Sequence, residues 1–135
     1  MIAQAPIRSA AAEGLTERVD AIACLDERVR RRASSAGPIE PGRYIEVQGP
    51  GERLLVSLEE GVTHIGRGLA ADLRLDDKSV SRRHAMLVHD PTGARILDDR
   101  SSNGTVVNGR RVEQADLKNG DELVLGRVVL HYLEV

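Results

Sequence analysis

The feature that most constrains the fold of this chain is a change in the spacing of its apolar residues near residue 42. After that point they alternate with polar residues or form short bursts, as β-strands do. Before it they recur every three or four positions, as on one face of an α-helix, at Leu15, Val19, Ile22, Leu25 and Val29. Asp26 interrupts this stripe, and no capping box opens it. The pattern predicts a short helical segment followed by an all-β domain.

The second part of the chain is a series of candidate strands separated by residues that favour turns. The turn signals are Gly-Pro-Gly at 49–51, Asp-Pro-Thr-Gly at 90–93 and Asn-Gly at 103–104, 108–109 and 119–120. The candidate strands are Tyr44–Gln48, Leu54–Leu58, Val62–Ile65, Leu73–Leu75, His84–His89, Ala94–Leu97, Val106–Val107, Glu122–Leu125 and Val128–Leu133. Because the alternation of strands with long helices is absent, we expect an antiparallel β-sandwich or barrel.

Residues 34–42 form a segment dense in Ser, Gly and Pro, which end regular structure. We therefore divide the chain into an N-terminal helical segment with a Gly/Pro linker, residues 1–40, and a β domain, residues 41–135. An amphipathic helix on a polar tail needs something to cover its apolar face. It could dock on the β domain, pair with a partner protein, or mediate self-association.

Composition excludes several classes of site. The chain has two Tyr, no Phe and no Trp, so we expect an aliphatic core and no site built on stacked aromatic rings. The single Cys24 excludes an internal disulfide and a Cys-x-x-Cys metal site, and His64, His89 and His131 have no partners at metal-ligand spacing. We therefore expect neither a metal nor another cofactor.

Charge and hydropathy limit the partners. The formal net charge of −2 argues against a general electrostatic attraction to nucleic acid. No apolar run approaches the ~20 residues of a membrane-spanning helix, and the N-terminus lacks the pattern of a signal peptide. We expect a cytoplasmic protein that is not inserted in a membrane.

Three short segments carry polar residues that a purely structural domain would not need. They are Ile65-Gly66-Arg67-Gly68, Ser79-Val80-Ser81-Arg82-Arg83-His84-Ala85 and Ser101-Ser102-Asn103-Gly104-Thr105-Val106-Val107-Asn108-Gly109. Each is a weak signal alone. In this order and spacing, they resemble the motifs of the forkhead-associated (FHA) domain family, over roughly residues 43–134.

The resemblance implies a β-sandwich that binds phosphothreonine peptides through loops at one end. It assigns phosphate contact to Arg67 and Ser81 and places Arg82 beside them. It assigns Asn103 to contact with the main chain of the ligand, and Ser102 to contact through a further hydroxyl. Ser102 stands where the family often has Thr, so the hydroxyl donor is kept and a methyl group is lost.

The resemblance also implies residues that support the loops without touching the ligand. It gives His84 the structural role of tying the binding loops together. The other expected loop-shaping residues are Gly66, Gly104, Thr105, Asn108 and Gly109. Asn-Gly at 108–109 is a hairpin dipeptide that accepts positive φ at both central positions.

The residue types suit this task on chemical grounds. A phosphothreonine brings a charge of about −1.5 to −2 and three acceptor oxygens. Arg67 offers a planar fork of donors that stays charged, and Gly66 and Gly68 let the backbone approach closely. Asn103 can donate and accept together, as holding a peptide main chain requires.

Each assignment has a structural alternative. Arg67 could be a surface arginine in a Gly-rich turn, and Ser81 or Asn103 could cap turns. Arg82 and Arg83 could form a solvated basic face. Thr16, the only threonine before the β domain, is a candidate regulatory phosphosite, and its alternative is a residue at a helix start.

An enzyme is not expected. Ser81 and His84 could form a nucleophile–base pair, but a triad also needs an orienting acid and an oxyanion hole. No Gly-x-Ser-x-Gly, P-loop or Gly-x-Gly-x-x-Gly motif occurs. The sequence predicts a phosphothreonine-dependent binding module, an adaptor or regulator in Ser/Thr kinase signalling whose partner is a phosphorylated protein such as a kinase or its substrate. The alternative is a phosphate-independent scaffold whose N-terminal helix mediates assembly.

Overall fold

The computed structural model describes residues 17–37 and 40–135, and most of the regular secondary structure in this part of the chain is β-strand. A 3₁₀ turn, Ile22–Cys24, and the short helix α1, Glu27–Arg32, come first. The strands are β1 (Arg43–Gly49), β2 (Glu52–Leu58), β3 (Gly61–Gly66), β4 (Leu73–Arg74), β5 (Ala85–Asp90), β6 (Gly93–Asp98), β7 (Thr105–Val107), β8 (Arg110–Val112), β9 (Gln114–Leu117), β10 (Glu122–Leu125) and β11 (Val128–Glu134).

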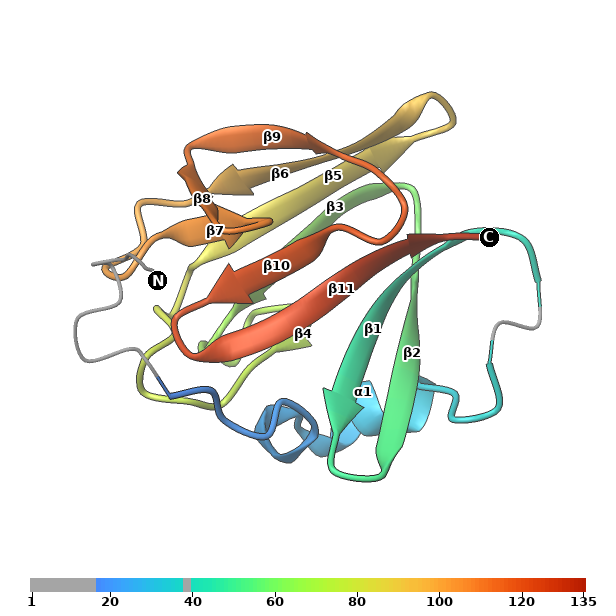
Figure 1. Ribbon diagram of the computed structural model, residues 1–135, viewed down its shortest axis with the longest axis horizontal. Helices are drawn as coiled ribbons and strands as arrows, with labels where there is room; N and C mark the ends of the chain where they lie inside the picture. The colour runs from blue at the N-terminus through green and yellow to red at the C-terminus, as the bar shows by residue number, and fades with distance from the viewer. Residues whose placement is uncertain (1–16, 38–39) are drawn as a thin grey trace, which may run out of the picture.

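The strands form two sheets that pack face to face (Figure 1). One sheet has the order β2-β1-β11-β10-β7-β8, and the other has the order β4-β3-β5-β6-β9. The paired strands are antiparallel except β3 and β4, which run parallel. The predicted antiparallel β-sandwich with a short helical segment before it is confirmed.

The core between the sheets is almost entirely aliphatic. In β11, Val128 and Leu130 are fully buried and alternate with half-buried residues, because successive side chains of a strand point to opposite faces. Tyr132 is an aromatic exception within this core, and its hydroxyl donates a hydrogen bond to Glu134 at 2.7 Å. Burial of apolar area of this kind is the main favourable term in folding.

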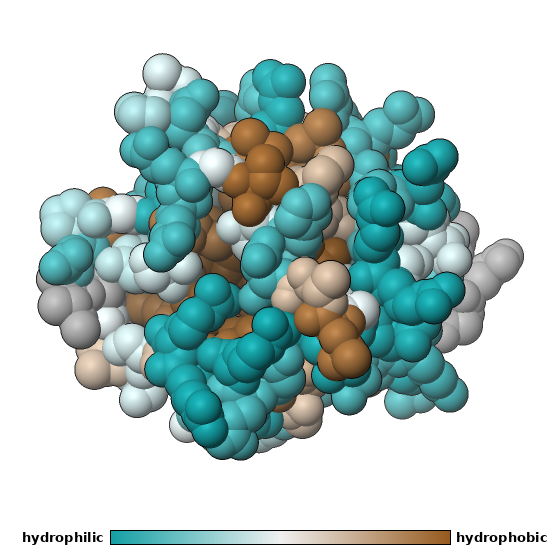
Figure 2. Space-filling model, turned by 180° about the vertical axis from the view of Figure 1, so that it is seen from behind, coloured by the Kyte–Doolittle hydropathy of each residue, from teal (hydrophilic) through white to brown (hydrophobic). Residues whose placement is uncertain are grey.

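Few large apolar side chains of the described residues stay exposed. Seen from behind, the surface is largely hydrophilic, with apolar side chains gathered in a hollow near the middle (Figure 2). Val62 of β3 and Val88 of β5 are cross-strand neighbours and are 49% and 36% exposed. No helix within residues 17–37 and 40–135 is long and apolar enough to cross a membrane.

The N-terminal segment packs on the sandwich, which is the first of the three arrangements open to it. The stripe residues Ile22, Leu25 and Val29 are buried in the same core as the strands. Leu25 forms a β-bridge with Leu75, just after β4, and α1 then lies behind the lower part of β1 and β2 in the view of Figure 1. The apolar face is therefore covered by the protein itself.

This segment differs from a single helix over residues 15–29. The Asp26 carboxylate accepts the backbone N–H of Val29 at 3.0 Å and so caps the start of α1, and Asp20 accepts the N–H of Ile22 at 3.0 Å. An aspartate at such a position competes with helix continuation, because its side chain takes the place of an intrahelical acceptor. Leu15 and the candidate phosphosite Thr16 lie outside the described residues.

Strands β8 and β9 were not among the candidate strands. Both consist mainly of exposed polar residues, with Val112 half-buried in β8 and Leu117 buried at the end of β9. Their extended conformation follows from pairing with β7 and β6. The Arg-Arg-Val of β8 shows no apolar alternation, and the alternation in the Gln-Ala-Asp-Leu of β9 spans only four residues with a single large apolar side chain.

Candidate functional site

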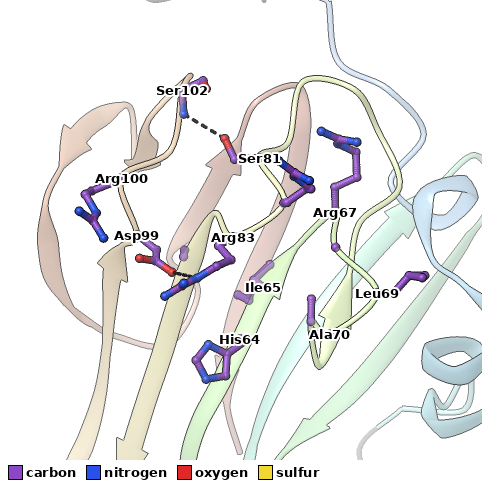
Figure 3. Close-up of a pocket in the computed structure, with 14 residues that line it drawn as sticks. His64, Ile65, Arg67, Leu69, Ala70, Ser81, Arg83, Asp99, Arg100 and Ser102 are labelled. Carbon is purple, nitrogen blue, oxygen red and sulfur yellow. Dashed lines mark hydrogen bonds and ion pairs between the residues drawn. The ribbon is translucent and has the colours of Figure 1, made fainter.

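Three loops that follow or precede the strands of the five-stranded sheet meet and line one open pocket (Figure 3). They are residues 67–72 between β3 and β4, residues 75–84 between β4 and β5, and residues 99–104 between β6 and β7. We call this the loop-end pocket. Its lining includes four of the five residues expected to contact a ligand, namely Arg67, Ser81, Arg82 and Ser102.

Arg67 is fixed at its base and open at its tip. Its backbone N–H donates to the Ser81 carbonyl at 2.9 Å, and its Nε donates to the Val80 carbonyl at 2.9 Å. The Arg67 carbonyl accepts from Nε of Arg74 at 2.8 Å. Within the described residues the guanidinium forms no ion pair, and its two terminal nitrogens make no hydrogen bond. The side chain therefore carries a positioned cation in the lining of the pocket.

The glycine at the end of β3 allows the close contact of the first two loops. A Cβ atom on Gly66 would overlap the backbone carbonyl of Arg82, and the Gly68 N–H donates to the same carbonyl at 3.1 Å. Any larger residue at 66 would push the loop of Ser81 away from Arg67.

The Ser81 hydroxyl links the second loop to the third. Its Oγ accepts the backbone N–H of Ser102 at 2.9 Å (Figure 3). A hydroxyl carries one donor and two acceptor positions, so the Ser81 O–H is still available to donate to a ligand. Arg82 and Ser102 are exposed beside it. A cation, a hydroxyl donor and two further polar side chains thus share one rim.

Asn103 lies just beyond the pocket lining. Its Nδ2 donates to the Ser79 carbonyl at 2.8 Å, which leaves the second amide hydrogen and Oδ1 for a ligand. Ser79 in turn donates to Asp77 at 2.5 Å and accepts the N–H of Arg127 at 2.8 Å. The side-chain amide of Asn103 is therefore held by Ser79, which is itself fixed by Asp77 and Arg127.

The Asp77 carboxylate is a support that sequence reasoning missed. It pairs with Arg127 at 3.1 Å across a separation of fifty residues. Burial by itself raises the pKa of Asp77, but the hydrogen bonds from Ser79 and Arg127 outweigh burial and hold the pKa below its usual range. The local signal was the Asp-x-Ser pair, since Asp77 also accepts the backbone N–H of Ser79.

Asp98 organises the third loop in the same way. It accepts the hydroxyl groups of Ser101 at 2.6 Å and Thr105 at 2.7 Å. Burial raises its pKa, but these hydrogen bonds outweigh burial and lower it overall. Thr105, expected to shape a turn, is the first residue of β7 and is fully buried, so its role in the loop is through this hydroxyl.

Positive φ angles occur where the motif has Gly and Asn. Gly104 has φ +84°, and Asn108 and Gly109 at the β7–β8 hairpin have φ +50° and +83°. These are the values that a two-residue hairpin turn of the Asn-Gly type needs. The chain can therefore reverse twice within the third motif.

His84 joins the second and third loops from inside the protein. The ring is fully buried, its Nε2 lies 2.8 Å from the Gly104 carbonyl, and its Nδ1 accepts the backbone N–H of Ser81 at 3.1 Å. Because Nδ1 accepts, the neutral ring carries its hydrogen on Nε2 and donates it to Gly104. Nδ1 faces the amide of Ser81 and not its hydroxyl, so this ring is not placed to take the hydroxyl proton.

We predict that His84 stays neutral when solvent-exposed histidine would already be charged. Desolvation lowers its pKa below the ordinary value of 6.5, and the weaker effects of Gly104 and Asp98 oppose this. A histidine whose pKa is depressed by folding stabilises the fold above pH 6.5, and this contribution is lost as the pH falls below it. An NMR titration of the ring should give a midpoint below 6.5 and an Nε2–H tautomer, and a midpoint above 6.5 would contradict the assignment.

Comparison with known proteins gives consistent relatives. The family model described as "FHA domain" matches residues 63–126. The chain is 38% identical over 106 residues to an ABC transporter ATP-binding/permease protein of Mycobacterium tuberculosis, covering 76% of this chain and 12% of that protein. It is 37% identical over 97 residues to the glycogen accumulation regulator GarA of the same organism, covering 70% of this chain. The chain thus spans about three fifths of GarA, 60% by length.

Solved structures extend the comparison to the fold. A structure reported for phosphothreonine-dependent FHA domain interactions matches with a TM-score of 0.65 and 34% identity, covering 69% of this chain and 96% of that chain. The likeness to this solved structure covers the two-sheet fold that carries the loops of the pocket.

Proposed function

This chain belongs to the forkhead-associated (FHA) domain family, and from that premise we propose that its loop-end pocket binds phosphothreonine in a partner protein. Arg67 and Ser81 hold the phosphate, with Arg82 beside them. Asn103 holds the main chain of the ligand, and Ser102 adds a hydroxyl. The domain that carries this site is residues 41–135, with residues 17–37 packed on it.

One observation supports the proposal more than any other. The tip of Arg67 has free donors, and it lies in the same pocket as a Ser81 hydroxyl whose acceptor side is already used by Ser102. A guanidinium and a hydroxyl that can donate are what a phosphate dianion requires. An internal ion pair on Arg67 would have argued against this role.

The biological role that we infer is that of an adaptor or regulator in Ser/Thr kinase signalling in the cytoplasm. GarA, a relative of this chain, is named as a regulator. The partner is a phosphorylated protein, such as a kinase or its substrate, and not a nucleic acid. We infer that the protein acts by binding and not by catalysis, and the bonds of the buried His84 ring to backbone groups on both sides argue against its use as a base for Ser81.

The test is a pair of peptide libraries that differ only in the phosphate on a central threonine, with a phosphoserine library as a control. We expect the full chain to bind phosphothreonine peptides with a Kd near micromolar, which corresponds to about −8 kcal/mol, and to bind the unphosphorylated peptides at least about 100-fold more weakly. Fluorescence anisotropy gives both values. Equal affinity for the two libraries would favour a phosphate-independent scaffold instead.

A further inference from the structure

The loop-end pocket carries more positive charge than one phosphothreonine neutralises. Four arginines line it, Arg67, Arg82, Arg83 and Arg100, against one acidic residue, Asp99. Their formal sum is about +3, on a chain whose net charge is −2. A phosphothreonine brings about −1.5 to −2, so roughly one positive charge stays uncompensated when it binds.

The arginines of this pocket are not equivalent. Nε of Arg83 pairs with the Asp99 carboxylate at 3.1 Å, and that carboxylate is only 12% exposed. Arg67 serves the phosphate in the proposed function, with Arg82 beside it. Arg82 and Arg100 are exposed, and neither forms an ion pair within residues 17–37 and 40–135. Arg100 is therefore the exposed, unpaired cation of this pocket to which the proposed function gives no role.

Arg100 lies on the opposite wall of the pocket from Arg67. Figure 3 shows Arg100 with the Arg83–Asp99 pair on one side, Arg67 on the other, and Ser81 between them. The backbone of Arg100 has φ +55°, in the left-handed region that few non-glycine residues adopt. The loop thus fixes the direction in which this cation leaves the chain.

Small residues form part of the lining, while Arg83, Ile65 and His64 lie between the two walls (Figure 3). Gly68, Ala70, Ala71 and Ala85 are part of the lining, so ligand side chains next to a phosphothreonine have room to enter. On the other side of the pocket, beyond the Arg83–Asp99 pair, lies the exposed cation of Arg100 (Figure 3).

We propose that the preferred ligand of this pocket carries a second anionic side chain close to the phosphothreonine, and that Arg100 binds it. The proposal rests on the proposed function and deepens it. The second anion is either a carboxylate or a second phosphate, because both accept the donors of a guanidinium. Arg100 is then a specificity-determining residue.

The test compares phosphothreonine peptides with neutral flanks, with aspartate placed at each flanking position in turn, and with phosphoserine placed there. An exposed arginine–carboxylate pair is worth a few-fold in affinity, so we expect the best aspartate peptide to bind about 2- to 5-fold more tightly than the neutral one. The gain should shrink as salt is added, because exposed charges are screened. The larger gain, for aspartate or for phosphoserine, identifies the source of the second anion.

Variants of the full chain assign that gain to Arg100. Arg100→Asn keeps a residue that tolerates the left-handed backbone and should remove the preference for the anionic peptides. Arg100→Lys keeps the charge and should retain part of it. Arg95→Ala is the matched control, since Arg95 is half-exposed and pairs with Asp116 outside the pocket lining.

The outcomes separate this proposal from the one on which it rests. Binding of phosphothreonine peptides without any preference for a second anion would overturn the inference and leave the proposed function standing. A preference that persists in Arg100→Asn would also overturn it. If no phosphothreonine peptide bound, the proposed function itself would be wrong.

Discussion

Arg67→Ala is expected to lower the affinity for a phosphothreonine peptide roughly 30-fold to several thousand-fold. Removing one partner of a desolvated, hydrogen-bonded charge pair costs about 2–5 kcal/mol, much of it from the charge left unpaired. Arg67→Lys should lose part of the affinity, because an ammonium cannot supply the two parallel donors of a guanidinium. Calorimetric titration of the three proteins with one peptide measures both effects.

The Arg67 variants need a control for folding, because Nε of Arg67 also holds the Val80 carbonyl. Urea unfolding followed by far-UV circular dichroism suits a chain that has no tryptophan. Arg95→Ala, which removes an arginine outside the pocket lining, should bind the peptide as the unaltered protein does. Unchanged affinity in a folded Arg67→Ala protein would show that another group holds the phosphate.

His84→Ala is expected to have the largest effect on stability, about 3–5 kcal/mol of the free energy of unfolding. The substitution leaves the Ser81 N–H and the Gly104 carbonyl without their ring partner inside the protein, and each unpaired buried group costs about 1–3 kcal/mol. The cavity left by the ring adds to this. Binding should fall as well, because the second and third loops are no longer joined.

The matched control is His89→Ala. His89 lies on β5, the strand that begins directly after His84, is also buried, and its Nδ1 has no hydrogen-bond partner among the described residues. This substitution leaves a cavity but breaks no bond between the loops, so it should cost less stability and leave peptide binding unchanged. Equal losses for the two variants would mean that the His84 bonds contribute nothing beyond packing.

The β-sandwich was predictable because its strands carry their own signals. In Glu122–Leu125 the predicted and observed bounds agree, since a short apolar run is bounded there by Asn-Gly and Gly turn residues. β8 and β9 were not predictable, because their polar residues are held extended by neighbouring strands. The N-terminal stripe predicted which residues are buried but not their conformation, because Asp26 ends one local structure and starts the next.

The residues of the site also divide into those that could be predicted from the sequence and those that could not. Arg67 and Ser81 could be predicted because turns with a purely structural role rarely need an arginine and a serine hydroxyl within motifs that occur in this order. Asp98 and the Asp77–Arg127 pair could not be assigned, because their importance depends on distances between segments far apart in the chain. The role of Arg100 required the charge count of a surface that three loops build together.

The docking of the N-terminal segment has a consequence for how small this protein can be made. Besides the Leu25–Leu75 bridge, the Cys24 carbonyl accepts the N–H of Asp76 at 2.8 Å, and a terminal nitrogen of Arg28 donates to the Ala71 carbonyl at 3.1 Å. On the sandwich, the groups that make these contacts belong to Ala71, Leu75 and Asp76, all in the segment that follows Arg67. A protein cut down to the strands alone would lose these contacts with the segment that follows Arg67, whose guanidinium lies in the pocket. Residues 17–37 therefore belong to the smallest unit that we expect to bind the ligand.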